Sequence, residues 1–140
     1  MNEAAILMNR IAGDLARAGD RILRAELGIS YSRVLVLLAL DLDGPASQQD
    51  LARWLGSTAP AVTGLLGELS AAGYVQVSAD PDNRRRNRVD LTGEGQRIIR
   101  AARALLDRSF DELLRKADVD GAVLVTALSR IAATIQKAGD

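Results

Sequence analysis

The sequence of 140 residues predicts a mainly α-helical (α+β) chain with about six helices and a small sheet of two or three strands. Apolar residues recur at helical spacing through most of the chain. Two short segments near the middle alternate between apolar and polar residues, which is typical of strands. Serine, threonine, glycine and proline stand at the expected boundaries of these elements. We therefore expect one domain over residues 1–140.

The composition excludes several kinds of function. Cysteine and histidine are absent, which removes disulfides, thiolate metal sites, the commonest metal ligand and the usual general base. The sequence shows no paired carboxylates, phosphate-binding loop or nucleophile motif. The formal net charge is zero, which argues against a polycation that coats nucleic acid. We therefore expect no enzyme, no cofactor and no metal site.

The sequence also carries no sign of export or membrane insertion. No uninterrupted apolar run reaches transmembrane length. The first ten residues contain Glu3 and lack the basic region and apolar block of a signal peptide. We therefore expect a cytoplasmic protein with no membrane partner.

The first two predicted helices differ in character. Residues 3–26 carry an apolar stripe with arginines between its members, although Gly13 and Gly19 each cost roughly 1 kcal/mol relative to alanine. The second helix begins after Ser30, a plausible N-cap, and is apolar all round. This pattern predicts a buried central helix. Residues 43–45 end it, because glycine suits a left-handed exit and proline cannot continue a helix.

Two shorter helices joined by a tight turn come next. Residues 47–50, Ser-Gln-Gln-Asp, resemble a capping box with Asp in place of the usual Glu. The helix that follows should bury Leu51 and Leu55, and we expect Trp54 beside them in the core or at an interface.

The sequence of the second helix of this pair predicts one buried apolar stripe. Gly56 turns the chain, and Ser57 is a good N-cap for the helix that follows. Gly73 ends this helix. The stripe is formed by Val62, Leu65, Leu66 and Leu69.

A hairpin and two longer helices complete the chain. Residues 74–77 and 88–91 alternate as strands do, and residues 80–83 between them, Asp-Pro-Asp-Asn, have turn chemistry. Helices are expected over about 93–116, capped by Thr92, and over about 119–137. Four arginines fall within five residues near the hairpin tip: Arg84, Arg85, Arg86 and Arg88. Such a run is as compatible with a solvated loop as with nucleic-acid binding.

The order of these elements indicates a winged helix-turn-helix over about residues 30–91. Two short helices joined at Gly56 and Ser57 suggest the helix-turn-helix, and the arginine-tipped hairpin suggests the wing. This combination points to a protein that binds duplex DNA. The expected partner is therefore double-stranded DNA.

The helices at the two ends of the chain predict a dimer. Each has an apolar stripe that can fold back onto the winged unit or pack against a second copy of the chain. We favour a homodimer built from residues 3–26 and 93–137, because two-fold symmetry matches the two half-sites that helix-turn-helix proteins usually read. The expected interface residues are Ile11, Leu15, Ile22, Leu124, Leu128, Ile131 and Ile135.

The chain resembles the multiple-antibiotic-resistance regulators, the MarR family of bacterial transcription factors. The most specific match is Asp80-Pro81-Asp82-Asn83-Arg84-Arg85 followed by Val89-Asp90-Leu91-Thr92-Gly93-Glu94-Gly95. In the family this region is an acidic turn, an Asp-x-Arg triplet and a strand ending Leu-Thr-x-x-Gly. Residues 49–52 and 62–75 are similar to the two helix-turn-helix segments of the family.

The resemblance implies a role for each part of the chain. Arg85 matches the wing arginine that enters the minor groove, and residues 58–72 match the major-groove recognition helix. The end helices match the dimerisation region. Many members also bind a small aromatic anion between that region and the winged unit and then release DNA. The ligand-binding residues of this chain are not identified by the motif.

Two features depart from the family pattern. Asn83 stands in place of the Asp of the triplet, so it can accept a hydrogen bond but cannot form an ion pair. The recognition helix contains no Lys or Arg, and Gly64 stands where relatives often have a basic residue. Pro60, Thr63, Gly64 and Gly67 lie opposite the leucine stripe on a helical wheel, so they face the groove or pack against another helix.

Two functions therefore remain open from the sequence. The first is a homodimeric, ligand-responsive transcription regulator, expected to be a repressor, that binds an inverted-repeat operator. The alternative is a winged-helix interaction or ligand-binding protein that has lost specific DNA binding. The DNA-contacting residues expected for the first are Ser47, Arg53, Ser57, Thr58, Pro60, Thr63, Gly64, Arg84, Arg85, Arg86 and Arg88.

Overall fold

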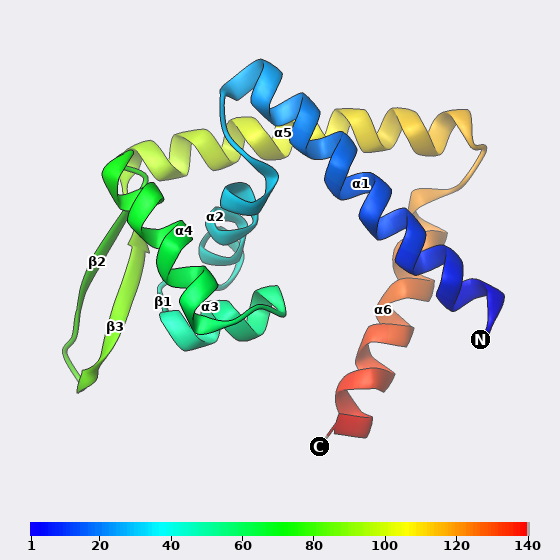
Figure 1. The fold of residues 1–140 in the computed structure, drawn as a ribbon. Coiled ribbons are helices and arrows are strands. Elements are labelled where there is room, and N and C mark those ends of the chain that lie inside the picture. Colours follow the sequence, from blue (N-terminus) through cyan, green and yellow to red (C-terminus); the bar gives the residue numbers. More distant parts are fainter. Residues whose placement is uncertain (140) are drawn as a thin grey trace. The chain divides into compact units, whose positions relative to one another are not determined.

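The computed structural model describes residues 1–139, apart from the side chain of Arg84. Within this range the chain forms six helices and one three-stranded sheet, so the expected mainly helical α+β fold is confirmed (Figure 1). It divides into two compact units, Met1–Arg103 and Ala104–Asp140, and the boundary falls within α5. The elements are α1 (Glu3–Leu27), α2 (Tyr31–Asp43), β1 (Ala46–Ser47), α3 (Gln48–Leu55), α4 (Ala59–Ala71), β2 (Val75–Asp80), β3 (Asn83–Leu91), α5 (Gly93–Lys116) and α6 (Gly121–Gly139).

Helix α1 is joined to the start of α2 by a carboxylate. The Asp20 side chain accepts hydrogen bonds from the Tyr31 N–H at 2.9 Å and from Arg24 Nε at 2.8 Å. These two bonds hold the pKa of Asp20 below its ordinary value, with the Tyr31 bond as the larger cause. Arg17 pairs with Asp14 at 2.6 Å in the same helix. The arginines of α1 are thus partly neutralised by their own helix.

Helix α2 is the buried centre of the first unit, as expected. The Ser30 side chain caps it by accepting the Arg33 N–H, and Gly44 ends it with φ of 81°. Complete burial of one large aliphatic side chain contributes roughly 1.5–3 kcal/mol, so this helix anchors the unit. Its buried residues are Val34, Val36, Leu37, Ala39 and Leu40.

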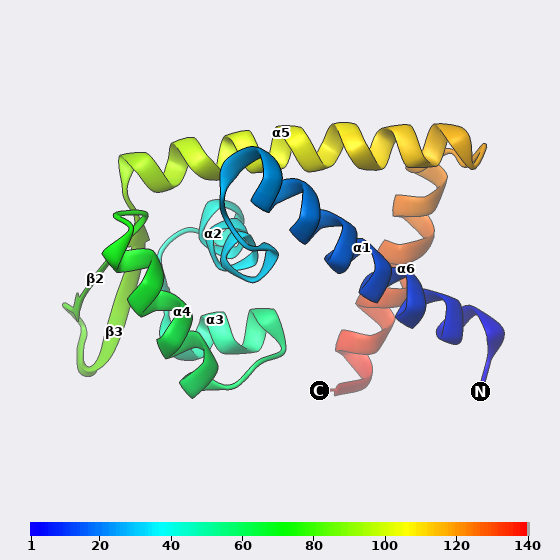
Figure 2. The same cartoon turned by 45° about the horizontal axis from the view of Figure 1, so that its top comes forward.

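In the helix-turn-helix, the N-cap of α3 is the expected residue, whereas the N-cap of α4 lies one residue later than predicted. The Ser47–Asp50 capping box is present, and Gly56 exits α3 in the left-handed region with φ of 61°. The prediction that Ser57 caps α4 is wrong, because α4 begins at Ala59, whereas Ser57 belongs to the turn and its N–H donates to the Ala52 carbonyl at the end of α3. The cap falls one residue later, where the Thr58 side chain accepts the Ala61 N–H at 3.3 Å. Figure 2 shows α3 and α4 beside the hairpin.

The sheet is longer than the alternating pattern predicts. Strands β2 and β3 pair antiparallel, with Val75 opposite Leu91 and Val77 opposite Val89, and β1 adds to the other edge of β3 in the order β1-β3-β2. The predicted strands, 74–77 and 88–91, cover only the base of this hairpin. Beyond it the ladder continues through polar residues such as Ser78 and Asn87, where neither face is buried and no apolar alternation marks the strand.

The second unit contains the end of α5 and all of α6. The Asp120 side chain accepts the Ala122 N–H at 2.9 Å, so α6 begins at Gly121 rather than at residue 119 as predicted. None of the described residues of α6 is buried in the single chain. Its large apolar side chains are open to solvent, with Val123 66% and Ile135 67% exposed.

Candidate nucleic-acid interface

One face of α4 is small, uncharged and open. Pro60, Thr63, Gly64 and Gly67 are all exposed, whereas Val62, Leu66 and Leu69 on the opposite side are buried. The expected stripe is therefore confirmed, with Leu65 half-buried at its edge. A Cβ atom built at Gly64 or Gly67 would meet nothing within 4 Å. Within the described residues, no other helix of this chain packs on these glycines.

A glutamine from α3 reaches this face and was not predicted as a site residue. Gln48 Nε2 donates to the Ala59 carbonyl at 3.1 Å and also to Thr63 Oγ1. The Thr63 hydroxyl itself donates to the same carbonyl at 2.9 Å. Gln48 is the first residue of α3, so the capping box could have drawn attention to it. The packing of α3 on α4 is what brings it to Thr63.

The start of α4 and the end of α3 contribute further polar groups. Ser57 and Thr58 are exposed, and Thr58 also caps α4. The N-terminal end of a helix carries partial positive charge and suits a phosphate. Arg53 is exposed on α3, where its guanidinium pairs with Asp50 of the preceding turn. The hydroxyl groups of Ser57 and Thr58 and the Arg53 guanidinium therefore lie within the same helix-turn-helix.

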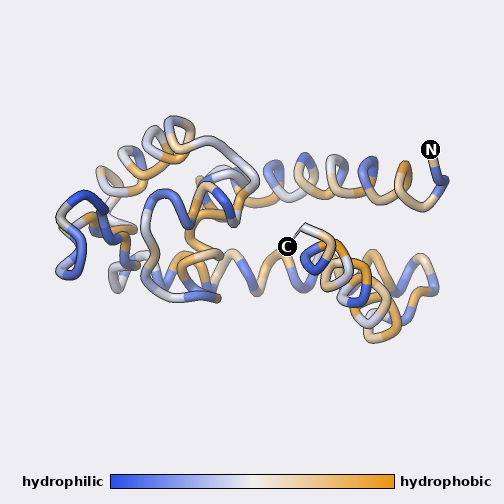
Figure 3. The backbone as a smooth tube through the Cα atoms, turned by 90° about the horizontal axis from the view of Figure 1, so that it is seen from below, coloured by the Kyte–Doolittle hydropathy of each residue, from blue (hydrophilic) through white to orange (hydrophobic). Residues whose placement is uncertain are grey.

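At the wing tip the backbone is ordered by side chains of the acidic turn. The Asn83 side chain accepts the Arg85 N–H at 3.0 Å, and Asp80 accepts the Asp82 N–H at 2.9 Å. Asn83 therefore shapes the turn by accepting a hydrogen bond, without the ion pair that an aspartate could form. Arg85 is exposed. Figure 3 shows the β2–β3 hairpin as a strongly hydrophilic segment.

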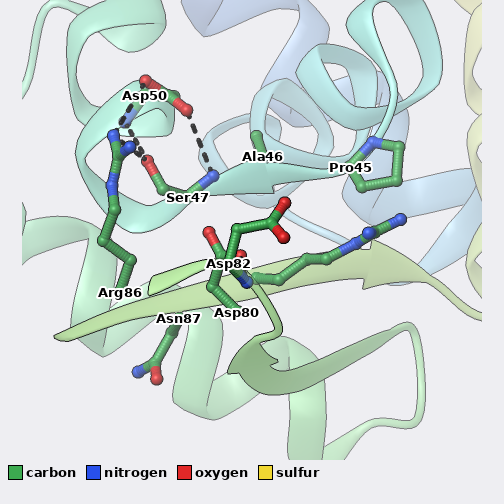
Figure 4. Close-up of a pocket in the computed structure, with 9 residues that line it drawn as sticks. Pro45, Ala46, Ser47, Asp50, Asp80, Asp82, Arg86 and Asn87 are labelled. Atoms are coloured by element: carbon green, nitrogen blue, oxygen red, sulfur yellow. Dashed lines mark hydrogen bonds and ion pairs between the residues drawn. The ribbon is translucent and has the colours of Figure 1, made fainter. Parts of the chain in front are cut away.

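The Arg86 side chain is half-buried and is directed toward the protein. It crosses from β3 to the first turn of α3, where its guanidinium lies 3.5 Å from Ser47 Oγ and 3.9 Å from Asp50 Oδ1 (Figure 4). The expected contact of Arg86 with DNA stays a prediction, and in the chain without DNA its guanidinium lies near the Asp50 carboxylate. Arg88 pairs with Asp90 along the same strand at 3.3 Å.

Ser47 and Asp50 form a polar anchor under the wing. Ser47 is only 8% exposed, and its hydroxyl accepts the Asp50 N–H at 3.1 Å. The pKa of Asp50 is lowered, first by hydrogen bonding with the Ser47 side chain and then by Arg53 and the Ser47 N–H. The geometry gives Ser47 a capping and anchoring role, and its expected contact with DNA stays a prediction.

A polar hollow of about 300 Å³ lies beside this anchor, between β1 and the wing. Asp80 and Asp82 face it from the hairpin, as Figure 4 shows, together with Arg86 and Arg88. No group of acidic side chains within the described part of the chain is arranged to hold a metal ion.

Trp54 lies at the surface. It is 40% exposed and borders a shallow hollow of about 220 Å³ with Asp43, Pro45 and Leu51. Of the two expected positions, core or interface, the core position is wrong, because α3 is short and presents only Leu51 and Ala52 to the core. The interface position stays a prediction.

The residues expected at a dimer interface remain accessible in the single chain. In α1, Ile11 is 50% exposed, and Leu15 and Ile22 are half-buried. In α6, Leu128 and Ile131 are 42% and 41% exposed, Ile135 is 67% exposed and Leu124 is half-buried.

Comparison with known proteins agrees with this architecture. Residues 27–86 match the model of the family described as the MarR family. Over 85 residues the chain is 32% identical to the uncharacterized HTH-type transcriptional regulator YfiV of Bacillus subtilis (strain 168). That match covers 61% of this chain and 53% of YfiV, so the chain spans about half the length of this curated relative.

Solved structures share the fold over nearly the whole chain. The transcriptional regulator BldR from Sulfolobus solfataricus is 26% identical, with a TM-score of 0.80 over 96% of this chain and 99% of BldR. Wild-type apo MarR from E. coli is 21% identical, with a TM-score of 0.81 over 94% of this chain and 97% of MarR. The architecture is therefore that of the MarR-type winged helix-turn-helix regulators.

The match to the MarR family model covers the winged helix-turn-helix segment, and solved structures of MarR-type regulators share the fold of nearly the whole chain. Throughout residues 1–139, no helix combines the length and the apolar character needed to cross a membrane.

Proposed function

We propose that this protein is a transcription regulator that binds duplex DNA with α4 and the β2–β3 wing. The observation that carries the proposal is the open, small-residue face of α4 in the same compact unit as the exposed wing residue Arg85. A mutant MarR from E. coli complexed with operator DNA supports it, with a TM-score of 0.71 and 22% identity over 91% of this chain.

In this proposal α4 enters the major groove. The groove is wide enough for a helix, and Gly64 and Gly67 allow the helix backbone to approach the bases closely. The Pro60 ring and the Thr63 methyl group can touch thymine methyl groups. Ser57 and Thr58, at the helix start, and Arg53 lie where they can meet the phosphate backbone.

The wing supplies the positive charge that α4 lacks. Arg85 enters the minor groove, where narrow A·T-rich stretches have the most negative potential. Arg84 and Arg88 contact phosphates, with Arg88 exchanging its Asp90 partner for a phosphate. Because α4 contributes no cation, operator affinity depends strongly on these contacts, and it falls with salt concentration in proportion to the number of phosphates that they neutralise.

The regulator acts as a homodimer in this proposal. The winged unit, about residues 30–91, binds DNA, and the helices of about 3–26 and 93–137 form the dimer. Their exposed apolar side chains, including Ile11, Leu128 and Ile131, are the support for this interface. Two-fold symmetry then requires an inverted-repeat operator with half-sites roughly 10 bp apart.

We further propose that a small aromatic anion releases the dimer from DNA and so relieves repression in a bacterial cytoplasm. NadR in complex with 4-hydroxyphenylacetate shares the fold, with a TM-score of 0.81 and 22% identity. DNA binding of Bordetella bronchiseptica BpsR is described as regulated by 6-hydroxynicotinic acid, and BpsR matches with a TM-score of 0.75 and 20% identity. A coupling of about 1–3 kcal/mol between ligand and DNA is typical of allosteric systems.

The uncharged recognition helix favours a second candidate, a winged-helix interaction protein without specific DNA binding. Sequencing genomic fragments retained by the purified protein separates the two functions. A regulator enriches a symmetric site, and fluorescence anisotropy shows tighter binding to that site than to a scrambled duplex at every salt concentration. Retention of no fragment above background even at low salt would support the interaction protein.

A further inference from the structure

We propose that the polar atoms at the centre of the α4 face act only as hydrogen-bond acceptors, and that they read the exocyclic amino group of adenine or cytosine. The atoms are Thr63 Oγ1 and Gln48 Oε1, and Gln48 is a further specificity-determining residue. This inference rests on the proposed binding of α4 in the major groove and names the base chemistry that α4 selects.

The Thr63 hydroxyl has no donor left for DNA. A hydroxyl carries one proton and two lone pairs. Its proton is donated to the Ala59 carbonyl at 2.9 Å, and one lone pair accepts Gln48 Nε2. The remaining lone pair of this exposed residue can only accept a hydrogen bond.

The Gln48 amide is oriented by the same carbonyl. Its Nε2 carries two protons, of which one is donated to Ala59 O at 3.1 Å and the other to Thr63 Oγ1. A flipped amide would place Oε1 against the carbonyl oxygen, with no proton between the two acceptors. Nε2 is therefore held inward, and Oε1 remains as a second acceptor.

The other exposed residues at the centre of the α4 face add no hydrogen-bond donor beside these two acceptors. Pro60, Gly64 and Gly67 are exposed and carry no side-chain donor. In the major groove, adenine presents N6–H and cytosine N4–H as donors, whereas guanine presents only the acceptors N7 and O6. The Gln48–Thr63 pair therefore selects an amino-bearing base and disfavours guanine at the same position.

Base analogues test the polarity directly. In the operator selected by the wild-type protein, each half-site adenine is replaced by purine, which lacks the 6-amino group, or by 7-deazaadenine, which lacks the N7 acceptor. Each cytosine is replaced by 2-pyrimidinone, which lacks the 4-amino group. At one position per half-site, loss of the amino group should weaken binding on the order of tenfold, whereas loss of N7 should change it by less than about twofold.

Protein variants then assign the effect. Thr63→Val and Gln48→Ala should each reduce the penalty for the missing amino group, and the double variant should lose less than the sum of the two single losses because the side chains act together. Thr63→Ser should retain the discrimination. Gln49→Ala, at the exposed neighbouring glutamine, is the matched control and should behave as the wild type. Thermal melts establish that each variant is folded.

The outcomes separate this inference from DNA binding itself. If the wild type selects an operator but weakens only when N7 is removed, a protein donor reads the base and the acceptor assignment is overturned while the regulator function stands. An unchanged amino-group penalty in both Thr63→Val and Gln48→Ala overturns the residue assignment. If the wild type prefers no duplex, the proposed function fails and this inference fails with it.

Discussion

Gly95 stands where the base of the wing meets the start of α5, and replacing it with alanine should destabilise the protein. Gly95 is buried, and a Cβ atom there would lie 2.0 Å from the Tyr74 carbonyl oxygen and 3.2 Å from Leu91 Cδ2. The same carbonyl accepts the Thr92 N–H at 3.1 Å, and Thr92 Oγ1 accepts the Gly95 N–H at 3.0 Å. A methyl group therefore has to displace backbone that is already hydrogen-bonded.

The expected size of the effect follows from three contributions. Alanine gains about 1 kcal/mol over glycine as a helix former. Overpacking costs typically 1–3 kcal/mol, and a displaced hydrogen bond between Thr92 and Tyr74 costs about 1 kcal/mol more. The Gly95→Ala variant should therefore lose about 1–3 kcal/mol of unfolding free energy, although the substitution favours helix.

Urea denaturation followed by circular dichroism measures this loss, at one fixed protein concentration because self-association alters apparent stability. Gly67→Ala is the matched control, since Gly67 is also helical but a Cβ atom there would meet nothing within 4 Å. That variant should gain about 0.5–1 kcal/mol. A Gly95→Ala protein as stable as the wild type, with an unchanged dependence on urea, would refute the close-approach argument.

Three further perturbations test the wing, the anchor and the dimer. Arg85→Ala should weaken operator binding and reduce the slope of log binding constant against log salt concentration by about one unit. Arg86→Ala should change this slope less, because the Arg86 guanidinium lies against Ser47. Equal slope changes in anisotropy titrations would contradict this. The lowered pKa of Asp50 stabilises the folded protein above about pH 4, and this stabilisation is lost as the pH falls through the folded-state pKa. The melting temperatures of the wild type and Asp50→Asn should therefore converge in acid. A melting-temperature difference that stays constant with pH would count against the anchor. Leu128→Glu combined with Ile131→Glu should give monomers in light scattering, and a folded variant of unchanged mass would exclude this interface.

The two departures from the family pattern have physical consequences that can be compared. Asn83 retains the backbone hydrogen bond of the turn, so the wing keeps its shape without an acidic partner for Arg85. The loss of charge on α4 leaves Thr63 and Gln48 as its central polar groups. We expect the first change to affect operator affinity little and the second to increase the dependence on the wing.

The sequence alone determined the elements whose signals lie within a few residues of one another. Ser30 caps α2 and the Ser47–Asp50 box opens α3, because these hydrogen bonds span only three residues. The buried stripe of α4 and its open opposite face also followed from helical periodicity. The mainly helical winged architecture and its family resemblance were predictable for the same reason. The role of each site residue in DNA binding stays a prediction.

Only the tertiary structure decided the contacts between elements. Gln48 meets Thr63 across 15 positions of sequence, Arg86 meets Ser47 across 39, and Gly95 lies against Tyr74. Each contact depends on the distance and angle at which two elements pack, and the burial of other residues sets that geometry. A hydrophobic pattern specifies which face of an element is buried, but it does not specify which polar side chain on the other element will lie opposite. For that reason the sequence alone identified the arginine-tipped wing and the uncharged helix, and the packing alone revealed the anchor under the wing and the acceptor pair on α4.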